Sequence, residues 1–141
     1  MAEALDSAID WVAKHTRKYV ETDGEEGHMW KGVPTAVLTT TGRRSGQLRR
    51  NALIYARDGD NYVLVASAGG APDHPLWYKN LVADPSVGLQ VGAQKLTARA
   101  RTAATDEKAR LWPVMTSIWP DYDQYQAKTQ RDIPVVILEP T

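Results

Sequence analysis

Three segments in the first half of the chain carry the residue pattern of consecutive β-strands, and they constrain the fold more than any other feature. Residues 35–41 are rich in β-branched side chains and stop at a glycine. Residues 48–57 mix apolar and polar side chains and end at Asp58-Gly59, which is a strong hairpin signal. Residues 62–67 form a short apolar run of the kind found in buried strands. The pattern predicts three antiparallel strands.

The connection between the first two of these strands combines glycine with arginine. Gly42 and Gly46 permit left-handed backbone conformations that expose N–H groups. Guanidinium groups come from four residues in or just after the turn: Arg43, Arg44, Arg49 and Arg50. Peptide N–H groups together with arginine bind phosphate or carboxylate groups well. A polar hairpin tip with solvated arginines is the alternative, and the residue types alone do not decide between the two.

Length and composition narrow the classes of protein that this chain can be. Its 141 residues suit a single domain, 1–141, with a sizeable core. The 17 basic and 17 acidic residues cancel, so nucleic acid is not expected as a partner. Without cysteine there is no disulfide, thiol nucleophile or thiolate metal site, and no metal site is predicted. The chain lacks a bilayer-spanning apolar run and a signal peptide pattern, so a cytoplasmic location is expected.

Helices and further strands are expected on either side of the β-rich segment. An apolar repeat at three- and four-residue spacing predicts an amphipathic helix from about Asp6 to about Val20, with Asp6 or Ser7 as its N-cap. Packing on the sheet is the expected role of this helix, and contact with a membrane surface is the alternative. The later elements are helices at 75–83 and 105–118 and strands at 87–91, 95–102 and 133–138.

Local signals add detail to the second half of the chain. Asp73 and Thr105 are the expected N-caps of the two later helices, and Pro113 is expected to break or kink the second. His74 is interpreted as a local hydrogen-bonding residue rather than as a catalyst. About six strands, mostly antiparallel, favour a small closed barrel over a parallel sheet.

Tryptophan and tyrosine supply all of the aromatic rings, because phenylalanine is absent. Trp119, Tyr122 and Tyr125 recur at three-residue spacing, so on a helical turn they share one face. Rings with a polar edge suit a cleft for a flat ligand. Core packing explains the same spacing, and both interpretations stay open.

Short motifs occur in order along nearly the whole chain. They are Pro34-Thr35, Leu38-Thr39-Thr40 with Gly42-Arg43-Arg44-Ser45-Gly46, Val65-Ala66-Ser67 with Gly69-Gly70-Ala71-Pro72, His74-Pro75, Trp77-Tyr78 with Asn80-Leu81, Tyr125-Gln126, and Arg131. The set resembles the deazaflavin-dependent nitroreductase and quinone reductase family of actinobacteria. This resemblance implies a mainly β fold, a six-stranded antiparallel split β-barrel of the FMN-binding-like type. It also implies an oxidoreductase that transfers a hydride from reduced coenzyme F-420, an 8-hydroxy-5-deazaflavin derivative, to a planar acceptor such as a quinone or nitro compound.

The resemblance also implies which residues form the site. The phosphate and oligoglutamate tail of the coenzyme fall on Arg43, Arg44, Ser45, Leu48, Arg49 and Asn51. Its ring falls on the third strand, the loop after it and nearby side chains: Ala66, Ser67, Ala68, Gly69, Ala71, Trp77, Tyr78 and Asn80. The acceptor side falls on Trp119, Tyr122 and Tyr125, with Ser67 facing the same space.

These residue types suggest how the acceptor would be handled. Ser67 with Tyr122 or Tyr125 is expected to donate a hydrogen bond to the acceptor oxygen that gains charge. Trp119 replaces a tyrosine seen in prodrug-activating members of the family, which favours a quinone over a nitroimidazole. Ala68 stands where a lysine is common in the family, so one charged contact to the coenzyme is expected to be missing.

Two other functions remain as alternatives. The first is an FMN-dependent oxidoreductase on the same barrel, whose cofactor lacks the oligoglutamate tail. The second is a non-catalytic module that binds or carries deazaflavin, tetrapyrrole or fatty acid. Oligomeric state and peripheral contact with the inner face of the membrane are left open by the sequence.

Overall fold

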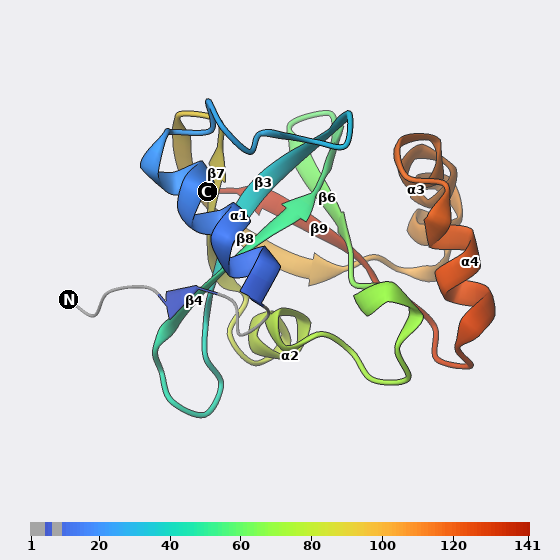
Figure 1. Ribbon diagram of the computed structural model, residues 1–141. Coiled ribbons are helices and arrows are strands. Elements are labelled where there is room, and N and C mark those ends of the chain that lie inside the picture. The colour runs from blue at the N-terminus through green and yellow to red at the C-terminus, as the bar shows by residue number, and fades with distance from the viewer. Residues whose placement is uncertain (1–4, 7–9) are drawn as a thin grey trace.

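A computed structural model describes residues 5–6 and 10–141, which build one sheet with helices around it (Figure 1). The longer strands are β3 (Val33–Thr41), β4 (Leu48–Ile54), β6 (Asn61–Val65), β7 (Ser86–Val91), β8 (Gln94–Thr102) and β9 (Val135–Pro140). The short strands are β1 (Leu5–Asp6), β2 (Met29–Trp30) and β5 (Ala56–Asp58). The helices are α1 (Asp10–Glu21), α2 (Leu76–Ala83), α3 (Thr105–Ile118) and α4 (Asp121–Lys128), and a 3-10 turn covers Ala68–Gly70.

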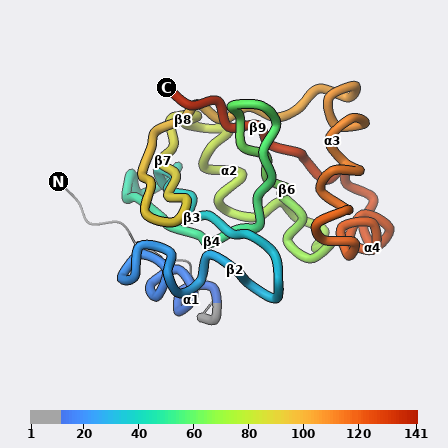
Figure 2. Tube along the Cα trace, turned by 90° about the horizontal axis from the view of Figure 1, so that it is seen from above, coloured from blue at the N-terminus to red at the C-terminus, as the bar shows by residue number. Residues whose placement is uncertain are grey.

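The sheet is curled but not closed. Its strands are hydrogen-bonded in the order β1-β4-β3-β7-β8-β9-β6-β5, and β2 pairs with β3. Every pair is antiparallel except β1 with β4. Seen from above, the strands surround α2, which covers the lower end of the half-barrel (Figures 1 and 2). The split-barrel prediction is confirmed, whereas the closed barrel favoured by the strand count is wrong, because within the described residues no ladder joins β4 to β6.

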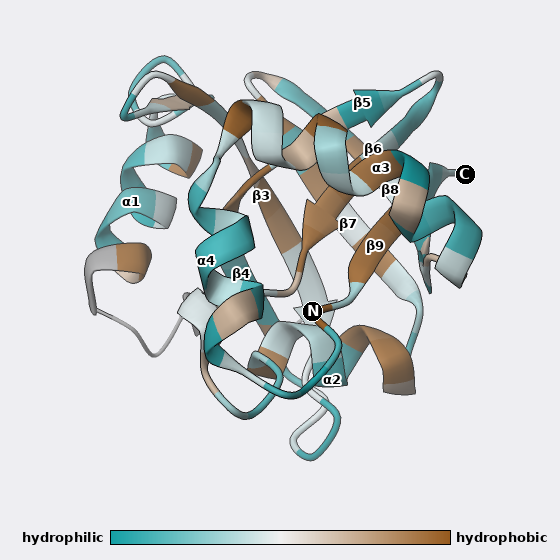
Figure 3. Cartoon of the chain, turned by 90° about the vertical axis from the view of Figure 1, so that its right-hand side faces the viewer, coloured by the Kyte–Doolittle hydropathy of each residue, from teal (hydrophilic) through white to brown (hydrophobic). Residues whose placement is uncertain are grey.

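Apolar side chains fill the inside of the half-barrel. Leu38, Leu64 and Leu138 point inward from three strands and are at most 1% exposed. Trp77 and Leu81 of α2 pack against the same cluster. Figure 3 shows this hydropathy pattern, with brown along β3, β6 and β9 and teal on much of α1. Each buried side chain of this size stabilises the fold by about 1.5–3 kcal/mol relative to exposure.

Strands β6 and β9 are buried on both faces. Val63, Val135 and Ile137 point away from the inner core and pack against Leu111 and Met115 of α3. Helices α3 and α4 therefore cover the outside of these strands, on the opposite side of the molecule from α1 (Figure 1). Burial on both faces explains why β9 reads as a continuous apolar run rather than as an alternating one.

Helix α1 packs along β4 and is anchored through polar groups. The Ala52 N–H donates to Thr16 Oγ1 at 3.0 Å. The fully buried Tyr19 hydroxyl donates to Thr35 O at 2.9 Å and accepts from the Gly92 N–H at 2.7 Å. Tyr19 therefore ties the helix to two separate points of the sheet.

Two predicted boundaries in the first half of the chain are wrong. Helix α1 begins at Asp10 rather than near Asp6, because Leu5–Asp6 pairs in parallel with β4. The alternative cap, Ser7, lies outside the described residues. The strand predicted over 48–57 is two strands, β4 and β5, separated at Tyr55.

The two predicted helix caps are also wrong. Helix α2 is preceded by Pro75, and the Asp73 carboxylate accepts instead from the His74 N–H at 2.9 Å and Lys79 Nζ at 2.6 Å. Helix α3 already includes Thr105. The main-chain N–H just before it, of Ala104, donates to the Glu107 carboxylate at 3.0 Å.

Pro113 does not end α3. The helix continues through this residue to Ile118. Pro113 is exposed, and its ring lies on the side of the helix away from the sheet. The His74 main-chain N–H donates locally to Asp73, in agreement with the sequence interpretation, whereas its imidazole contacts Arg131, 57 residues further along the chain.

Replacing Tyr19 with phenylalanine tests the anchoring of α1. Tyr19→Phe leaves a buried carbonyl and a partly buried N–H without their partner, so we expect the free energy of unfolding to fall by roughly 1–3 kcal/mol. Urea denaturation measures this change. Tyr62→Phe is the matched control, because within the described residues the buried Tyr62 has no hydroxyl hydrogen bond; it should cost less than about 0.5 kcal/mol. Equal losses in both variants would contradict the anchoring role.

Candidate active site

One large cleft of about 1080 Å³ runs along the open side of the half-barrel. Its walls come from α1, β4, the turn between β3 and β4, the loop after β6, the start of α2, and the junction of α3 and α4. The cleft is slightly larger than the range of roughly 300–1,000 Å³ found for small-molecule sites. Most predicted site residues line it: Arg43, Arg44, Ser45, Arg49, Asn51, Ser67, Ala68, Gly69, Ala71, Trp77, Asn80, Trp119, Tyr122 and Tyr125.

The remaining predicted coenzyme contacts lie outside this lining. Ala66 is fully buried, and its N–H donates to Pro134 O at 2.9 Å. The Tyr78 hydroxyl shares a hydrogen bond of 2.7 Å with Thr102 Oγ1. Leu48 pairs with the end of β3 and is half-buried. We do not include these side chains in the proposed site.

The arginine-bearing turn is a compact, cross-braced structure. The Gly46 N–H donates to Gly42 O at 2.8 Å, and Gly46 has φ +72°, a conformation that favours glycine. A side chain at Gly42 would lie 2.9 Å from Ser45 Oγ and 3.0 Å from Gln47 O, so the turn would have to shift to admit it. From α2, the buried Asn80 accepts from the Arg43 N–H at 3.2 Å and donates to Thr40 Oγ1 at 3.3 Å. Asn80 thus positions the turn, and one N–H of its amide is not used by these two bonds.

Positive charge gathers at this end of the cleft. Arg43 and Arg44 are exposed and Arg49 is half-buried. Within the described part of the chain, none of these three guanidinium groups has an ion-pair partner. Asp73 also lines the cleft, but its carboxylate is held by Lys79 at 2.6 Å. The turn is therefore able to bind an acidic ligand without first breaking an internal ion pair.

A single guanidinium group holds the loop after β6 in place. Arg131 donates to Ala66 O at 3.2 Å, to Ser67 O at 2.6 Å and to Ala71 O at 2.8 Å. These contacts direct three carbonyl oxygens toward Arg131. Arg131 belongs to the motif set of the sequence, but its contacts could not be read from it.

Arg131 also contacts His74. The distance from Arg131 Nη1 to His74 Nδ1 is 3.0 Å. Burial lowers the pKa of the His74 imidazole from its ordinary value of 6.5, and the positive charge of Arg131 lowers it further. His74 is therefore neutral at neutral pH, with Nδ1 as the acceptor of the arginine proton.

The same loop has an unusual backbone. Ala68, Gly69 and Gly70 all have positive φ, of 48°, 63° and 82°. A side chain at Gly70 would lie 2.7 Å from Tyr125 O, so glycine is needed for the close approach of α4. The loop and α4 are thus locked together beside Ser67.

Aromatic rings form the wall of the cleft at the junction of α3 and α4. Tyr122 is 4% exposed and its ring meets that of Tyr125 edge-on, with centroids 6.1 Å apart. Trp119 Nε1 donates to the Tyr125 hydroxyl at 3.3 Å. The core-packing interpretation holds for Tyr122, which packs against the outer core. All three rings line the cleft, and their contact with a flat ligand stays a prediction.

The Tyr122 hydroxyl keeps its proton and is suited to donate a hydrogen bond rather than to act as an acid. Burial raises the pKa of the Tyr122 phenol well above its ordinary value of 10.0, and Tyr125 raises it further. The hydroxyl has no hydrogen-bond partner within the described residues, and its oxygen atom is not completely buried. Because Tyr122 lines the cleft, its hydroxyl is available to a ligand there.

Sequence reasoning missed the contribution of the N-terminal part of the chain. Val12 and His15 of α1 and Trp30 of β2 all line the cleft. The His15 Nε2 atom is 2.7 Å from Gly27 O, which fixes the ring. No spacing signal connects these residues with the distant aromatic segment, so only the fold brings them together.

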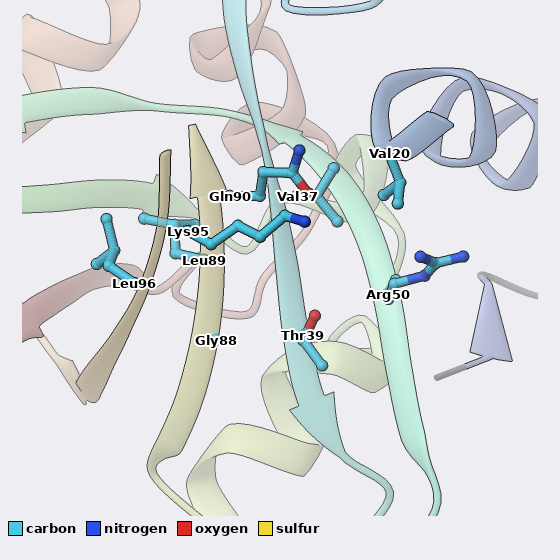
Figure 4. Close-up of a pocket in the computed structure, with 9 residues that line it drawn as sticks. All are labelled: Val20, Val37, Thr39, Arg50, Gly88, Leu89, Gln90, Lys95 and Leu96. Carbon is cyan, nitrogen blue, oxygen red and sulfur yellow. The ribbon is translucent and has the colours of Figure 1, made fainter. Parts of the chain in front are cut away.

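A second, smaller hollow of about 270 Å³ lies on the outer face of the sheet (Figure 4). Two of its polar side chains already interact with other groups of the protein. Lys95 Nζ is 4.0 Å from the Asp23 carboxylate, and the Gln90 amide donates to Gly92 O at 3.0 Å. The larger cleft is therefore the candidate active site.

Comparison with known proteins agrees with this assignment. The family model described as F420H(2)-dependent quinone reductase matches residues 11–140. The chain belongs to this family. The F420H(2)-dependent quinone reductase of Mycobacterium tuberculosis (strain ATCC 25618 / H37Rv) is 42% identical over 134 residues, which are 92% of this chain and 90% of that protein. The membership confirms the resemblance found in the sequence, and with it the enzyme class and the coenzyme.

Solved structures give the same result for the fold. The F420-H2 dependent reductase FDR-A is 40% identical, with a TM-score of 0.70 over 75% of this chain and 94% of that one. A structure described as a domain-swapped dimer is 38% identical, with a TM-score of 0.73 over 94% of this chain and all of that one. The quinone reductase family implies a quinone-like acceptor.

Replacing Arg131 tests its hold on the loop after β6. Arg131→Met leaves the Ala66 and Ser67 carbonyls without donors, so the free energy of unfolding should fall by roughly 1–3 kcal/mol. Amide hydrogen exchange in residues 66–74 should rise selectively. The pKa of His74, followed by NMR, should also rise, because a neighbouring positive charge is removed.

Arg57→Met is the control for this experiment. Arg57 is an exposed arginine of β5, and its loss should leave exchange in residues 66–74 unchanged. If exchange in that loop were the same in Arg131→Met as in the unmodified protein, the bracing role of Arg131 would be ruled out.

Proposed function

We propose that this protein reduces a quinone-like acceptor with electrons from reduced coenzyme F-420, bound in the cleft described above. The observation that supports this proposal most directly is the composition of the cleft. One end carries three guanidinium groups without ion-pair partners among the described residues, and the other carries aromatic rings in tilted and edge-on contact. A ligand with an acidic tail and a flat ring matches both ends.

The residues present fit the coenzyme. Arg43, Arg44 and Arg49 would hold its phosphate and carboxylates by charge-assisted hydrogen bonds. The loop residues Ser67 and Ala68 would lie against its ring, in a segment that Arg131 and α4 keep rigid. A cleft of about 1080 Å³ leaves space for an acceptor beside the coenzyme.

The chain's own groups would orient the acceptor and supply hydrogen bonds. When bound, the reduced deazaflavin supplies the hydride. Tyr125 accepts from Trp119 Nε1, which leaves its own hydroxyl proton free to point into the cleft. Ser67 and Tyr122 offer further hydroxyl donors, and their hydrogen bonds would stabilise negative charge on the acceptor oxygen. Water can complete the protonation, so none of these groups needs to be an obligate acid.

The alternatives make different demands on the site. An FMN enzyme has no oligoglutamate tail, so it gives the arginine cluster less to bind. A carrier module needs no hydroxyl donors at the ring. Titration with FMN and with coenzyme F-420 distinguishes an FMN enzyme from the proposed one. Oxidation of the reduced coenzyme by menadione distinguishes an enzyme from a carrier module.

The location of the protein remains a proposal. Among the described helices, none is long and apolar enough to cross a membrane. We propose a cytoplasmic enzyme that meets its acceptor in solution or at the inner face of the membrane. Co-sedimentation with anionic lipid vesicles distinguishes these two modes.

Charge reversal in the turn tests the coenzyme site. We expect Arg43→Glu and Arg49→Glu each to weaken coenzyme binding about tenfold or more, because each replaces an attraction with a repulsion. Fluorescence titration of the coenzyme at low salt measures the dissociation constant. Arg99→Glu, at an exposed position on β8 outside the cleft, is the matched control and should leave affinity within about twofold. Unchanged affinity in both turn variants would refute the assignment.

Removing one hydroxyl tests the acceptor side. Tyr122→Phe should lower kcat with menadione roughly 10- to 100-fold while the coenzyme dissociation constant stays within about twofold. Steady-state kinetics and titration are measured on the same preparation. Tyr62→Phe, which alters a core ring outside the cleft, should leave both quantities unchanged. Loss of coenzyme binding in Tyr122→Phe, without a separate effect on kcat, would show that the role is wrong.

A further inference from the structure

Two tryptophans from distant parts of the chain contact each other at the cleft, with their rings tilted. Trp30 of β2 and Trp119, at the end of α3, have ring centroids 5.3 Å apart and an interplanar angle of 37°. Both side chains are half-buried and both line the cleft. The pair therefore joins the N-terminal hairpin to the helical wall across the cleft.

Each ring is held by its own local structure. Trp30 pairs with Val33 around a two-residue turn, Lys31-Gly32, whose φ angles are +49° and +81°. Positive φ at both positions is typical of the tightest hairpin turns, so β2 is short but well defined. Lys31 Nζ lies 4.9 Å from the centroid of the Trp30 ring, a cation–π contact.

Trp119 is fixed from the opposite side. Its backbone N–H donates to Met115 O at 2.9 Å, and its indole N–H donates to Tyr125 at 3.3 Å. The Trp119 ring thereby extends the row of aromatic rings formed by Tyr125 and Tyr122. Trp30 adds the only ring in this row that comes from the N-terminal side of the cleft, among the residues that the structure describes.

The pair lies at the far end of the cleft from the arginine turn. Strand β2 pairs with the first residues of β3, whereas the turn follows the last residue of β3. A strand of nine residues spans roughly 25–30 Å. A coenzyme tail on the arginines would therefore leave the indole rings clear, and Ser67 lies in the loop between these two regions.

We propose that Trp30 and Trp119 form an acceptor bracket, which holds a flat, electron-poor quinone-like acceptor against the indole rings and selects for its size. This inference rests on the proposed function, because it names the acceptor class of the same cleft. Indole is an electron-rich ring, and offset stacking with a quinone adds to the apolar area that is buried. A bicyclic naphthoquinone covers more of both indole rings than a monocyclic benzoquinone does. Trp30 is therefore a specificity-determining residue for the acceptor.

The experiment compares Trp30→Ala, Trp30→Phe and the matched control Met29→Ala. Met29 is the neighbouring residue in β2, is 58% exposed and does not line the cleft. In Trp30→Ala, we expect KM for menadione to rise about fivefold or more and KM for 1,4-benzoquinone to rise less. The coenzyme dissociation constant should stay within about twofold, and Trp30→Phe should recover most of the loss. Met29→Ala should behave as the unmodified protein.

A measurement without turnover accompanies the kinetics. Two indoles in contact give an exciton couplet in far-UV circular dichroism, which both Trp30 variants should lose while the remaining spectrum shows that they are folded. Menadione binding to the protein with oxidised coenzyme is followed by quenching of the remaining tryptophan fluorescence, and Trp30→Ala should weaken it by the same factor as KM.

The possible outcomes test the acceptor bracket and the reductase activity separately. Unchanged menadione affinity and KM in a folded Trp30→Ala variant would overturn the bracket while leaving the reductase assignment intact. Absence of coenzyme oxidation by the unmodified protein would overturn the reductase assignment. Menadione binding that still depends on Trp30 would, even then, support the bracket as a site for flat aromatic rings.

Discussion

The pairing of β6 with β9 is the interaction on which the site depends. Both strands are buried on two faces, so their relative position is fixed by packing from the inner core and from α3. The ladder continues one step beyond β6, where the Ala66 N–H donates to Pro134 O at 2.9 Å. Because the strands are antiparallel, the end of β6 lies beside the start of β9. Arg131, shortly before β9, is therefore placed beside the carbonyls of the loop after β6. The packing of β6 and β9 thus also fixes the position of the loop after β6, which forms one wall of the cleft.

The open edge of the sheet supplies the cleft itself. Every residue of β4 is half-buried, which is unusual for a strand of a compact core and reflects its position beside the cleft. An uncovered edge strand invites pairing with other chains. Here β1 pairs with part of β4, and Thr16 of α1 accepts from Ala52 within it. The N-terminal segment therefore protects the edge while leaving the arginine and aromatic ends accessible.

Much of the architecture could be predicted because local signals and packing agree. The β-branched run in β3 and the apolar run in β9 have the residue types that buried strands need, and both were found. Boundaries failed where another contact decides: Leu5–Asp6 forms a strand only because the distant β4 is beside it, and Asp73 binds Lys79 within α2 instead of capping that helix. Trp30 could not be placed in the site from sequence, since no local pattern reports that β2 folds back toward α4.

Charge and burial divide the cleft between two kinds of chemistry. The whole chain is electrically neutral, so the positive turn creates a local field rather than a general attraction for anions. At the other end, burial keeps the pKa of the Tyr122 phenol high, and the ring row carries no formal charge. An acidic tail gains little by entering the aromatic end, and an uncharged flat acceptor gains little at the arginines. The two ends of the cleft therefore fix the orientation of a ligand that has an acidic tail and a flat ring, independently of any contact with the reacting atoms.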